Sequence, residues 1–568
     1  MKRLLIASLA WFPLVLTAAD NVAFWSEGEM IRVQMEAPPQ PVEDIVLCAP
    51  RNGHDAFQVV VRALPELQAQ SQISISTWQG PESSSLPQIS LFQEHYVSIT
   101  TSSPHAPFPA GDFADPLIPT ATGKFFALPT DSKPPVGIAS NQPWWLEVFV
   151  PKTATPGTYR AAISLQIGTQ QHAIPITLTV WPVTLPDQPT LRSAFGCHWG
   201  RIADIQHLPH NGHHPALRRM ALQYHDLLAS HHLTPEPLDP LINIDADGTI
   251  RDLTLEEYEH RFHEQHATSL PVPLSATWPF AHPLTRDRSA TIRYLASFMR
   301  IMKEHGWDRF CYLDCPVDEP ANAEDYALVR AWGKLCDEAE QACGTHLPML
   351  CTEQPIPTQA AWGSLVGAVD LWSPYLGDLW QHSEQTRQRQ AAGEEVWTYV
   401  AMVQYPPGFL KNNADHPLDH HPPAWLLDFA PMNYRITAWH CAANNWRGLL
   451  YWDTIHWPTG VNPWIDPGTF REGAQVYNGD GYLVYPTADG PVPSLRLKWL
   501  RASFEDHALI QLARDSGMST LAEAEVRKIA PGIADWAADA ASLLDARHRL
   551  GQALSVRPPQ AFLSTQRP

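Results

Sequence analysis

The chain has 568 residues, with 59 acidic and 39 basic side chains and a formal net charge of −20. This length exceeds that of one ordinary domain and predicts two or three domains. The strong negative charge opposes non-specific binding to nucleic acid or to anionic membrane surfaces, and we exclude both as general partners.

The first nineteen residues have the pattern of a secretory signal. Lys2 and Arg3 precede an apolar run at 4–16, and the small residues 17–19 follow. The run contains Pro13 and is shorter than the ~20 residues that span a bilayer. We therefore expect an exported protein, periplasmic or extracellular, that is not inserted in a membrane.

Residues 20–186 have a β pattern without intervening helices. Apolar residues alternate with other residues at 146–150 and at 174–180, and turn signals such as Thr155-Pro156-Gly157 separate the runs. This pattern predicts a β-sandwich domain. It contains no catalytic constellation, so we expect a supporting or glycan-contacting role.

After a linker near 185–189, strands alternate with helices over 187–516. Eight candidate strands occur, at 193–199, 234–238, 272–278, 310–313, 347–351, 369–372, 396–403 and 448–452. Helical spacing follows most of them, as at 216–232, 289–305, 322–343 and 433–445. Eight such units predict a (β/α)8 TIM-type barrel. The second strand and the helix after the fifth have the weakest patterns, so a doubly wound sheet remains an alternative.

Helical spacing also marks the C-terminal part of the chain. A long helix at 495–513 is expected to close the barrel. Residues 517–568 then form a helical extension and a tail, with an interruption at Pro531-Gly532.

The segment 308–320, DRFCYLDCPVDEP, joins the fourth candidate strand to two adjacent carboxylates, Asp318 and Glu319. The next helix is expected to begin at once, with Pro320 in its first turn. Loops between a strand and the following helix carry the chemistry in parallel α/β folds. Alternatively, Asp318 only caps the helix and Glu319 favours its dipole.

The other strand ends are rich in aromatic and acidic side chains, which a barrel would bring to one mouth. Aromatic rings stack on sugar faces, and carboxylates bind hydroxyls and move protons. A single aromatic residue is more often part of the core, but together these residues predict a carbohydrate site. The candidates are His198, Trp278, Glu353, Trp372, Tyr375, Trp397, Tyr399, Trp452 and Asp453.

Adjacent carboxylates seldom face each other across a sugar, as the usual glycosidase arrangement requires. They suit a mechanism in which the 2-acetamido oxygen of the sugar attacks the anomeric carbon. Asp318 would then be ionised and hold the acetamido group, while Glu319 would begin protonated and serve the leaving oxygen.

Several motifs of the chain resemble those of glycoside hydrolase family 123 and its uncharacterised relatives. They are RNGHDAFQ (51–58), DPLIP (115–119), TPGTY (155–159), CPVDEP (315–320), VWTY (396–399), GLLYWDT (448–454), and NGDGYLVYP followed by PSLRLKWLRASFED (478–506). The resemblance implies an N-terminal β-sandwich, a (β/α)8 barrel and β-N-acetylgalactosaminidase activity by the substrate-assisted mechanism. It implies that Asp318 orients the acetamido group and that Glu319 is the general acid/base. It also places Trp397, Tyr399 and Trp452 in segments that line the sugar pocket.

Other chemistries find little support in the sequence. His207, His210, His213 and His214 cluster in one segment, but no zinc motif, GxSxG elbow or phosphate-binding loop is present. We expect no metal and no cofactor. Two alternatives stay open: a glycosidase that pairs Glu319 with Glu353 or Asp453, and a non-catalytic glycan-binding protein. The eight Cys include no CxxC pair, and most are expected to be buried.

Overall fold

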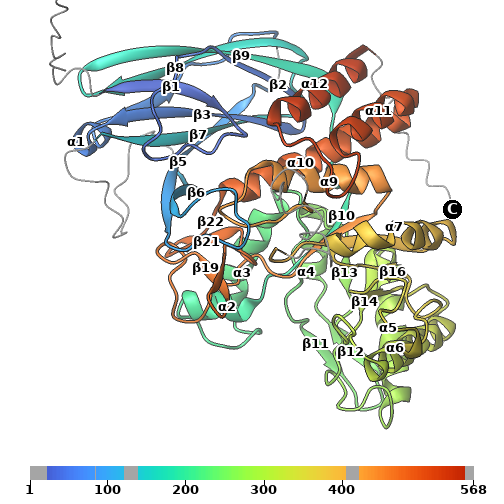
Figure 1. Ribbon diagram of the computed structural model, residues 1–568. Coiled ribbons are helices and arrows are strands. Elements are labelled where there is room, and N and C mark those ends of the chain that lie inside the picture. The colour runs from blue at the N-terminus through green and yellow to red at the C-terminus, as the bar shows by residue number, and fades with distance from the viewer. Residues whose placement is uncertain (1–21, 83–84, 121–138, 404–420, 557–568) are drawn as a thin grey trace, which may run out of the picture.

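The N-terminal region consists of two β-sheets that share one apolar core (Figure 1). The computed structural model describes residues 22–82, 85–120, 139–403 and 421–556. The five-stranded sheet has the order β1 (Ala23–Gly28), β3 (Gly53–Ala63), β7 (Ser140–Val150), β5 (Gln88–Ile99) and β6 (Gly111–Pro119). The four-stranded sheet has the order β2 (Ile45–Arg51), β9 (Gln170–Thr184), β8 (Gly157–Ile167) and β4 (Gln72–Ile75), and the short helix α1 is Pro65–Gln68. Alternate residues of both sheets, such as Val59, Val61, Ile163 and Leu165, are buried between them because side chains alternate along a strand.

A parallel sheet of seven strands forms the second part of the protein. Its order is β10 (Arg192–Phe195), β18 (Gly448–Tyr451), β17 (Glu395–Tyr399), β16 (Leu371–Trp372), β15 (Met349–Cys351), β14 (Cys311–Asp314) and β13 (Leu270–Pro271). The sheet curls into a nearly closed barrel. Between its two edges, Pro235 forms an isolated parallel bridge with Phe195, and the hydroxyls of Thr234 and Thr268 lie 2.9 Å apart.

Two of the strand predictions are wrong in detail. Residues 234–238 form no strand, because Pro235 and Pro237 have no N–H to donate to a ladder. Instead, the Arg261 guanidinium donates to the Pro235 carbonyl at 2.7 Å and to the Ser269 carbonyl at 3.0 Å. The third strand is β13 rather than 272–278, and proline again ends the ladder after Val272.

Helices follow most of the strands. They are α2 (Trp199–Ile205), α3 (Pro215–Ala229), α4 (Glu256–Glu259) with a π-helical turn at His260–Glu264, α5 (Arg288–Glu304), α6 (Ala323–Cys343), α7 (Leu376–Ala391) and α9 (Met432–Asn444). The weak pattern after the fifth strand corresponds only to a 3-10 turn at Ala360–Trp362. Three hairpins are inserted between these elements: β11 (Ile242–Ile244) with β12 (Ile250–Leu253), β19 (Gly468–Glu472) with β20 (Gln475–Asn478), and β21 (Val484–Thr487) with β22 (Gly490–Pro493).

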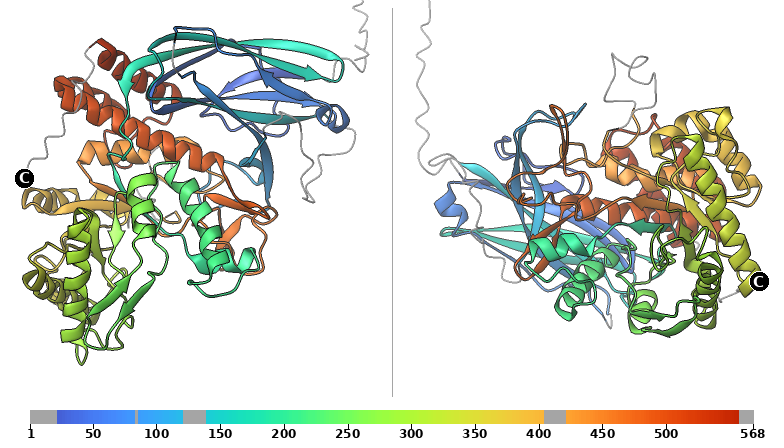
Figure 2. Two further views of the ribbon diagram at one scale, coloured as in Figure 1. Left: turned by 180° about the vertical axis from the view of Figure 1, so that it is seen from behind. Right: turned by 90° about the horizontal axis from the view of Figure 1, so that it is seen from below.

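The long helix α10 (Leu495–Ala513) lies between the N-terminal sheets and the parallel sheet (Figures 1 and 2). It has the predicted bounds, and the Ser494 hydroxyl caps it by accepting from the Leu497 N–H at 3.1 Å. Buried ion pairs join it to both sides. Lys498 pairs with Glu147 of β7 at 3.0 Å, and Asp506 pairs with Arg435 of α9 at 2.7 Å.

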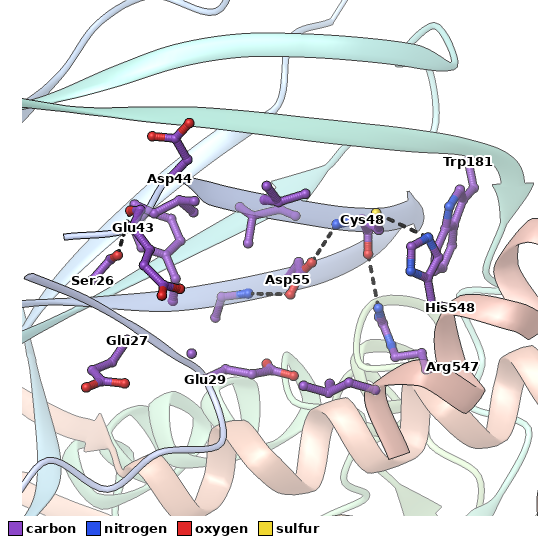
Figure 3. A pocket seen from close by; sticks show the side chains of 17 residues that line it. Ser26, Glu27, Glu29, Glu43, Asp44, Cys48, Asp55, Trp181, Arg547 and His548 are labelled. Carbon is purple, nitrogen blue, oxygen red and sulfur yellow. Dashed lines mark hydrogen bonds between the residues drawn. The ribbon is translucent and has the colours of Figure 1, made fainter. Parts of the chain in front are cut away.

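The chain returns to the N-terminal sheets through α11 (Ser519–Ile529) and α12 (Ala540–Val556), which are interrupted near Pro531 as predicted. A Cβ on Gly551 would meet the Trp181 ring of β9 at 2.3 Å, so glycine permits this close packing. The Arg547 guanidinium donates to Asp506 at 3.0 Å and to the Cys48 carbonyl at 3.1 Å (Figure 3). A cavity of about 400 Å³ lies between α12 and the strands β1 to β3.

All eight cysteines lie in the described part of the chain, and each is a free thiol there. Six are buried. Within the same residues, no helix has the length and apolarity that crossing a membrane would need.

Replacing Arg547 tests how strongly α12 holds the N-terminal sheets to α10. Arg547→Met leaves buried carboxylates with fewer partners, and we expect a loss of about 3–5 kcal/mol of stability. Arg549→Met is the matched control: its partner is Glu525 at 2.7 Å and its side chain is 38% exposed, so we expect about 1 kcal/mol or less. Calorimetric Tm values of the two variants check the difference, and equal losses would contradict it.

Candidate active site

Asp318 and Glu319 lie exposed in the loop between β14 and α6, at the carboxyl end of the parallel sheet. The helix begins at Ala323, three residues later than Pro320 predicted. Its cap is Asn322, whose side-chain oxygen accepts from the N–H groups of Glu324 and Asp325 at 2.9 and 3.0 Å. Neither carboxylate is therefore occupied in capping the helix.

Hydroxyl groups at the ends of two other strands, β15 and β17, contact these two residues. From the end of β15, the Thr352 hydroxyl donates to Asp318 Oδ1 at 2.7 Å and accepts from the Glu319 N–H at 2.9 Å. From the end of β17, the Tyr399 hydroxyl donates to Glu319 Oε1. Glu319 has a φ of +43°, a backbone conformation that is uncommon outside glycine.

Further carboxylates surround the pair and shift one another's proton affinities. Burial raises the pKa of Glu353 to about 7, and the charges of Asp378 and Glu319 add to the shift. Desolvation raises the pKa of Asp314 to about 7, and the charges of Glu236 and Asp318 add to the shift. The pKa of Asp378 is also raised by burial, against the opposing effect of His382.

Three of the predicted aromatic and histidine residues lie around the mouth. The Tyr375 ring packs edge-on against the Tyr399 ring at 5.5 Å. His198 Nδ1 lies 3.2 Å from Glu236 Oε2, with more than half of its side chain exposed. Trp278 is 40% exposed in the loop after β13 and packs edge-on against Tyr294 of α5 at 6.3 Å.

Trp372 and Trp397 are fully buried, and the structure does not bring their rings to the mouth. The Trp397 ring fills the barrel interior with Tyr312 and Leu350. Its Nε1 donates to Glu395 at 3.1 Å, and the Arg192 guanidinium lies 5.1 Å from the ring. Arg192 and Glu395 are the first residues of their strands, so this indole points to the end of the barrel opposite the carboxylate pair.

Trp372 is oriented in a similar way. Its Nε1 donates to Glu394, which directly precedes β17. Trp372 and Trp397 therefore belong to the packing of the sheet.

The last two candidates follow β18. The half-buried Trp452 indole packs over Gly481, where a Cβ would come within 2.3 Å of the ring. Asp453 is fully buried, and its Oδ1 accepts from the N–H groups of Thr454 and Ile455 at 2.8 and 3.1 Å. This carboxylate stabilises the turn that follows the strand.

Sequence reasoning missed Thr352, Asp314, Asp378 and Glu236. A signal was present for two of them. Asp314 lies within the segment 308–320, and Thr352 is the first polar residue after the strand predicted at 347–351. Both follow directly from the rule that strand ends meet at one mouth.

No group of three or more His, Cys, Asp or Glu in the described residues is arranged to hold a metal ion. Two of the clustered histidines have other partners. His210 pairs with Asp204 at 2.7 Å, and His214 caps α3.

One family model and one solved structure are similar to this chain. Residues 286–513 match the family model described as glycoside hydrolase 123, catalytic domain. A family 123 glycoside hydrolase from Clostridium perfringens has a similar fold, with a TM-score of 0.63 and 14% identity over 94% of this chain and 98% of that chain.

Two other solved structures are much less similar. A putative alpha-galactosidase from Bacteroides fragilis has a TM-score of 0.20 and 14% identity, over 62% of this chain and 59% of that chain. A beta-glucuronidase from Parabacteroides merdae has a TM-score of 0.27 and 8% identity, over 86% of this chain and 51% of that chain. No curated protein matches the chain.

The matched residues therefore resemble the catalytic domain of glycoside hydrolase family 123, and they include the loop with Asp318 and Glu319.

The raised pKa of Glu353 predicts a pH dependence of stability. Because the folded protein holds this proton more tightly than the unfolded chain, stability present below about pH 4.5 is lost as the pH rises toward about 7. Glu353→Gln removes this contribution. Its Tm should fall less than that of the wild type between pH 5 and pH 8, by about 2–4 °C. Parallel Tm curves for the two proteins in calorimetry would contradict this.

Proposed function

We propose that the protein is an exo-acting β-N-acetylhexosaminidase that releases terminal β-linked N-acetylgalactosamine with retention of configuration. The observation that carries this proposal is the divided environment of the two neighbouring carboxylates. Asp318 is held by a hydroxyl from β15, and Glu319 by a hydroxyl from β17. Neighbouring acids with different partners suit two different roles in one reaction.

In the proposed mechanism, the 2-acetamido oxygen of the bound sugar attacks the anomeric carbon and forms a cyclic oxazolinium intermediate. Protonated Glu319 gives its proton to the leaving oxygen. Ionised Asp318 accepts the acetamido N–H and stabilises the positive charge that develops on the ring. Glu319 then takes a proton from the water that opens the intermediate, so both carboxylates return to their initial state.

The environments of the two alternative nucleophiles, Asp453 and Glu353, also support this assignment. Asp453 is buried, with Oδ1 bound to two backbone N–H groups. Glu353 has a pKa of about 7, so a large fraction of this group is neutral near pH 7, whereas a carboxylate nucleophile must be ionised. Neither is well suited to attack an anomeric carbon, which favours the acetamido group of the substrate for that role.

The same proposal includes the substrate class, the export and the domain arrangement of the enzyme. The Clostridium perfringens enzyme is described in connection with the hydrolysis of glycolipid glycans, and we propose a glycan or glycoconjugate substrate here as well. The secretory pattern of the first nineteen residues supports export. We also propose that the parallel sheet, nearly closed by the bridge at Pro235, is a (β/α)8 barrel. A β-sandwich domain precedes this barrel, and a helical extension follows it.

Substitution of each carboxylate tests the mechanism. Glu319→Gln should reduce kcat on an aryl N-acetylgalactosaminide with a poor leaving group by about 10²–10⁴-fold, because the general acid is lost. Asp318→Asn should slow turnover by a similar factor. The exposed Glu324 in the first turn of α6 provides the matched control, and Glu324→Gln should keep wild-type kinetics.

Two further measurements define the substrate. A thiazoline mimic of the cyclic intermediate should bind the wild type much more tightly than the product sugar does. Aryl N-acetylgalactosaminides should be hydrolysed faster than the corresponding N-acetylglucosaminides. Wild-type turnover by Glu319→Gln, or no affinity for the thiazoline, would overturn the proposed mechanism.

A further inference from the structure

Thr352 occupies a central position between the two candidate catalytic residues. It follows the last residue of β15, and its hydroxyl contacts both Asp318 Oδ1 and the Glu319 N–H, at 2.7 and 2.9 Å. We propose that Thr352 is a positioning residue that orients the Asp318 carboxylate and sets the direction of Glu319. This inference rests on the proposed function, in which Asp318 reacts ionised and Glu319 reacts protonated.

The hydroxyl of Thr352 has one proton to donate and two lone pairs that can accept. The Glu319 N–H can only donate, so the hydroxyl oxygen accepts from it. The hydroxyl proton is directed to Asp318 Oδ1, which accepts it in the ionised form that the proposed function assigns to Asp318. A hydrogen bond donated to a carboxylate favours its ionised form. The arrangement also leaves Oδ2 of Asp318 to accept the acetamido N–H of the sugar.

The same hydroxyl stabilises the unusual backbone of Glu319. A positive φ is uncommon for a residue with a side chain, and at +43° it needs support from its surroundings. Thr352 supplies the acceptor for the N–H of this residue. As a result, the Glu319 side chain reaches the Tyr399 hydroxyl of β17, while Asp318 remains bound to the residue that follows β15.

A purely structural role for Thr352 makes different predictions. If the hydroxyl only joined two loops, its removal would lower stability without changing how the rate depends on pH. If it positions the carboxylates, its removal should change kcat and the acid limb of the pH profile. The acid limb reports the form of Asp318 that can stabilise positive charge.

The test compares Thr352→Val with Thr352→Ser. Valine has a similar shape but no hydroxyl, and serine retains it. On an aryl N-acetylgalactosaminide, Thr352→Val should lower kcat about 10- to 100-fold, with a smaller change in KM. The acid limb of kcat/KM should also change, because the Asp318 carboxylate loses the hydrogen bond that the Thr352 hydroxyl donates. Thr352→Ser should retain most of the rate and the wild-type pH profile.

Thr291→Val is the control for removing a threonine hydroxyl that does not contact Asp318 or Glu319. Its Oγ1 donates only to the Asp287 carbonyl within α5, at 3.0 Å. This variant should keep the wild-type kcat and pH profile. A loss of stability alone in Thr352→Val, with unchanged kcat and pH profile, would overturn the role of Thr352 while leaving the proposed function in place.

A crystal structure of Thr352→Val gives a readout that does not depend on activity. Glu319 should leave its positive φ, and the Asp318 side chain should turn from its present position. If the wild type hydrolyses no N-acetylhexosaminide, the proposed function fails, and this structure still decides the positioning role. Unchanged positions of both residues would overturn that role.

Discussion

The parallel pairing of β14 with β15 is the constraint on which the candidate site depends. In the observed register, Leu313 lies opposite Met349 and Asp314 opposite Leu350. The chain then leaves both strands at the same end, which brings Thr352 beside the loop of Asp318 and Glu319. A shift of one residue would turn the side chains to the opposite faces of the sheet. The contacts of Thr352 with Asp318 and Glu319 are therefore a consequence of backbone hydrogen bonding in the sheet.

Helices α10 and α12 connect the parallel sheet to the N-terminal sheets. Helix α10 contributes cations to Glu147 of the N-terminal sheets and a carboxylate to Arg435 of α9. Breaking one partner of a buried ion pair is costly, so these contacts restrict how the two parts can be arranged. Arg547 of α12 adds a second connection, to Asp506 and to the backbone of β2. The N-terminal sheets thus contribute rigidity, and the carboxylates lie on loops attached to a firmly held scaffold.

The mouth of the barrel concentrates negative charge. Glu236, Asp314, Glu353 and Asp378 all have raised pKa values, since burial and neighbouring carboxylates disfavour the charged form. The two central acids have different partners at this mouth: Thr352 at the end of β15 contacts Asp318, and Tyr399 at the end of β17 contacts Glu319.

Much of the scaffold could be predicted from sequence periodicity. The alternating strands, most of the helices of the second part and the bounds of α10 follow from local patterns, because amphipathic spacing reflects which face is buried. The site loop could also be predicted, since Asp318 and Glu319 follow a short apolar strand. The strand at 234–238, one of the weakest predictions, is reduced to a single bridge at Pro235, because the prolines at 235 and 237 lack the N–H groups of a ladder.

The directions of the aromatic side chains could not be predicted from the sequence. Trp397 and Tyr399 are two residues apart on β17, yet one ring fills the barrel interior toward its far end and the other carries its hydroxyl to Glu319. The sequence by itself determined which residue types lie near the strand ends and that two acids are neighbours in one loop. Only the tertiary structure decided which rings are core, which residue caps α6 and which hydroxyls hold each acid. Those contacts join residues far apart in the chain, and no local pattern encodes the direction of a side chain between strands.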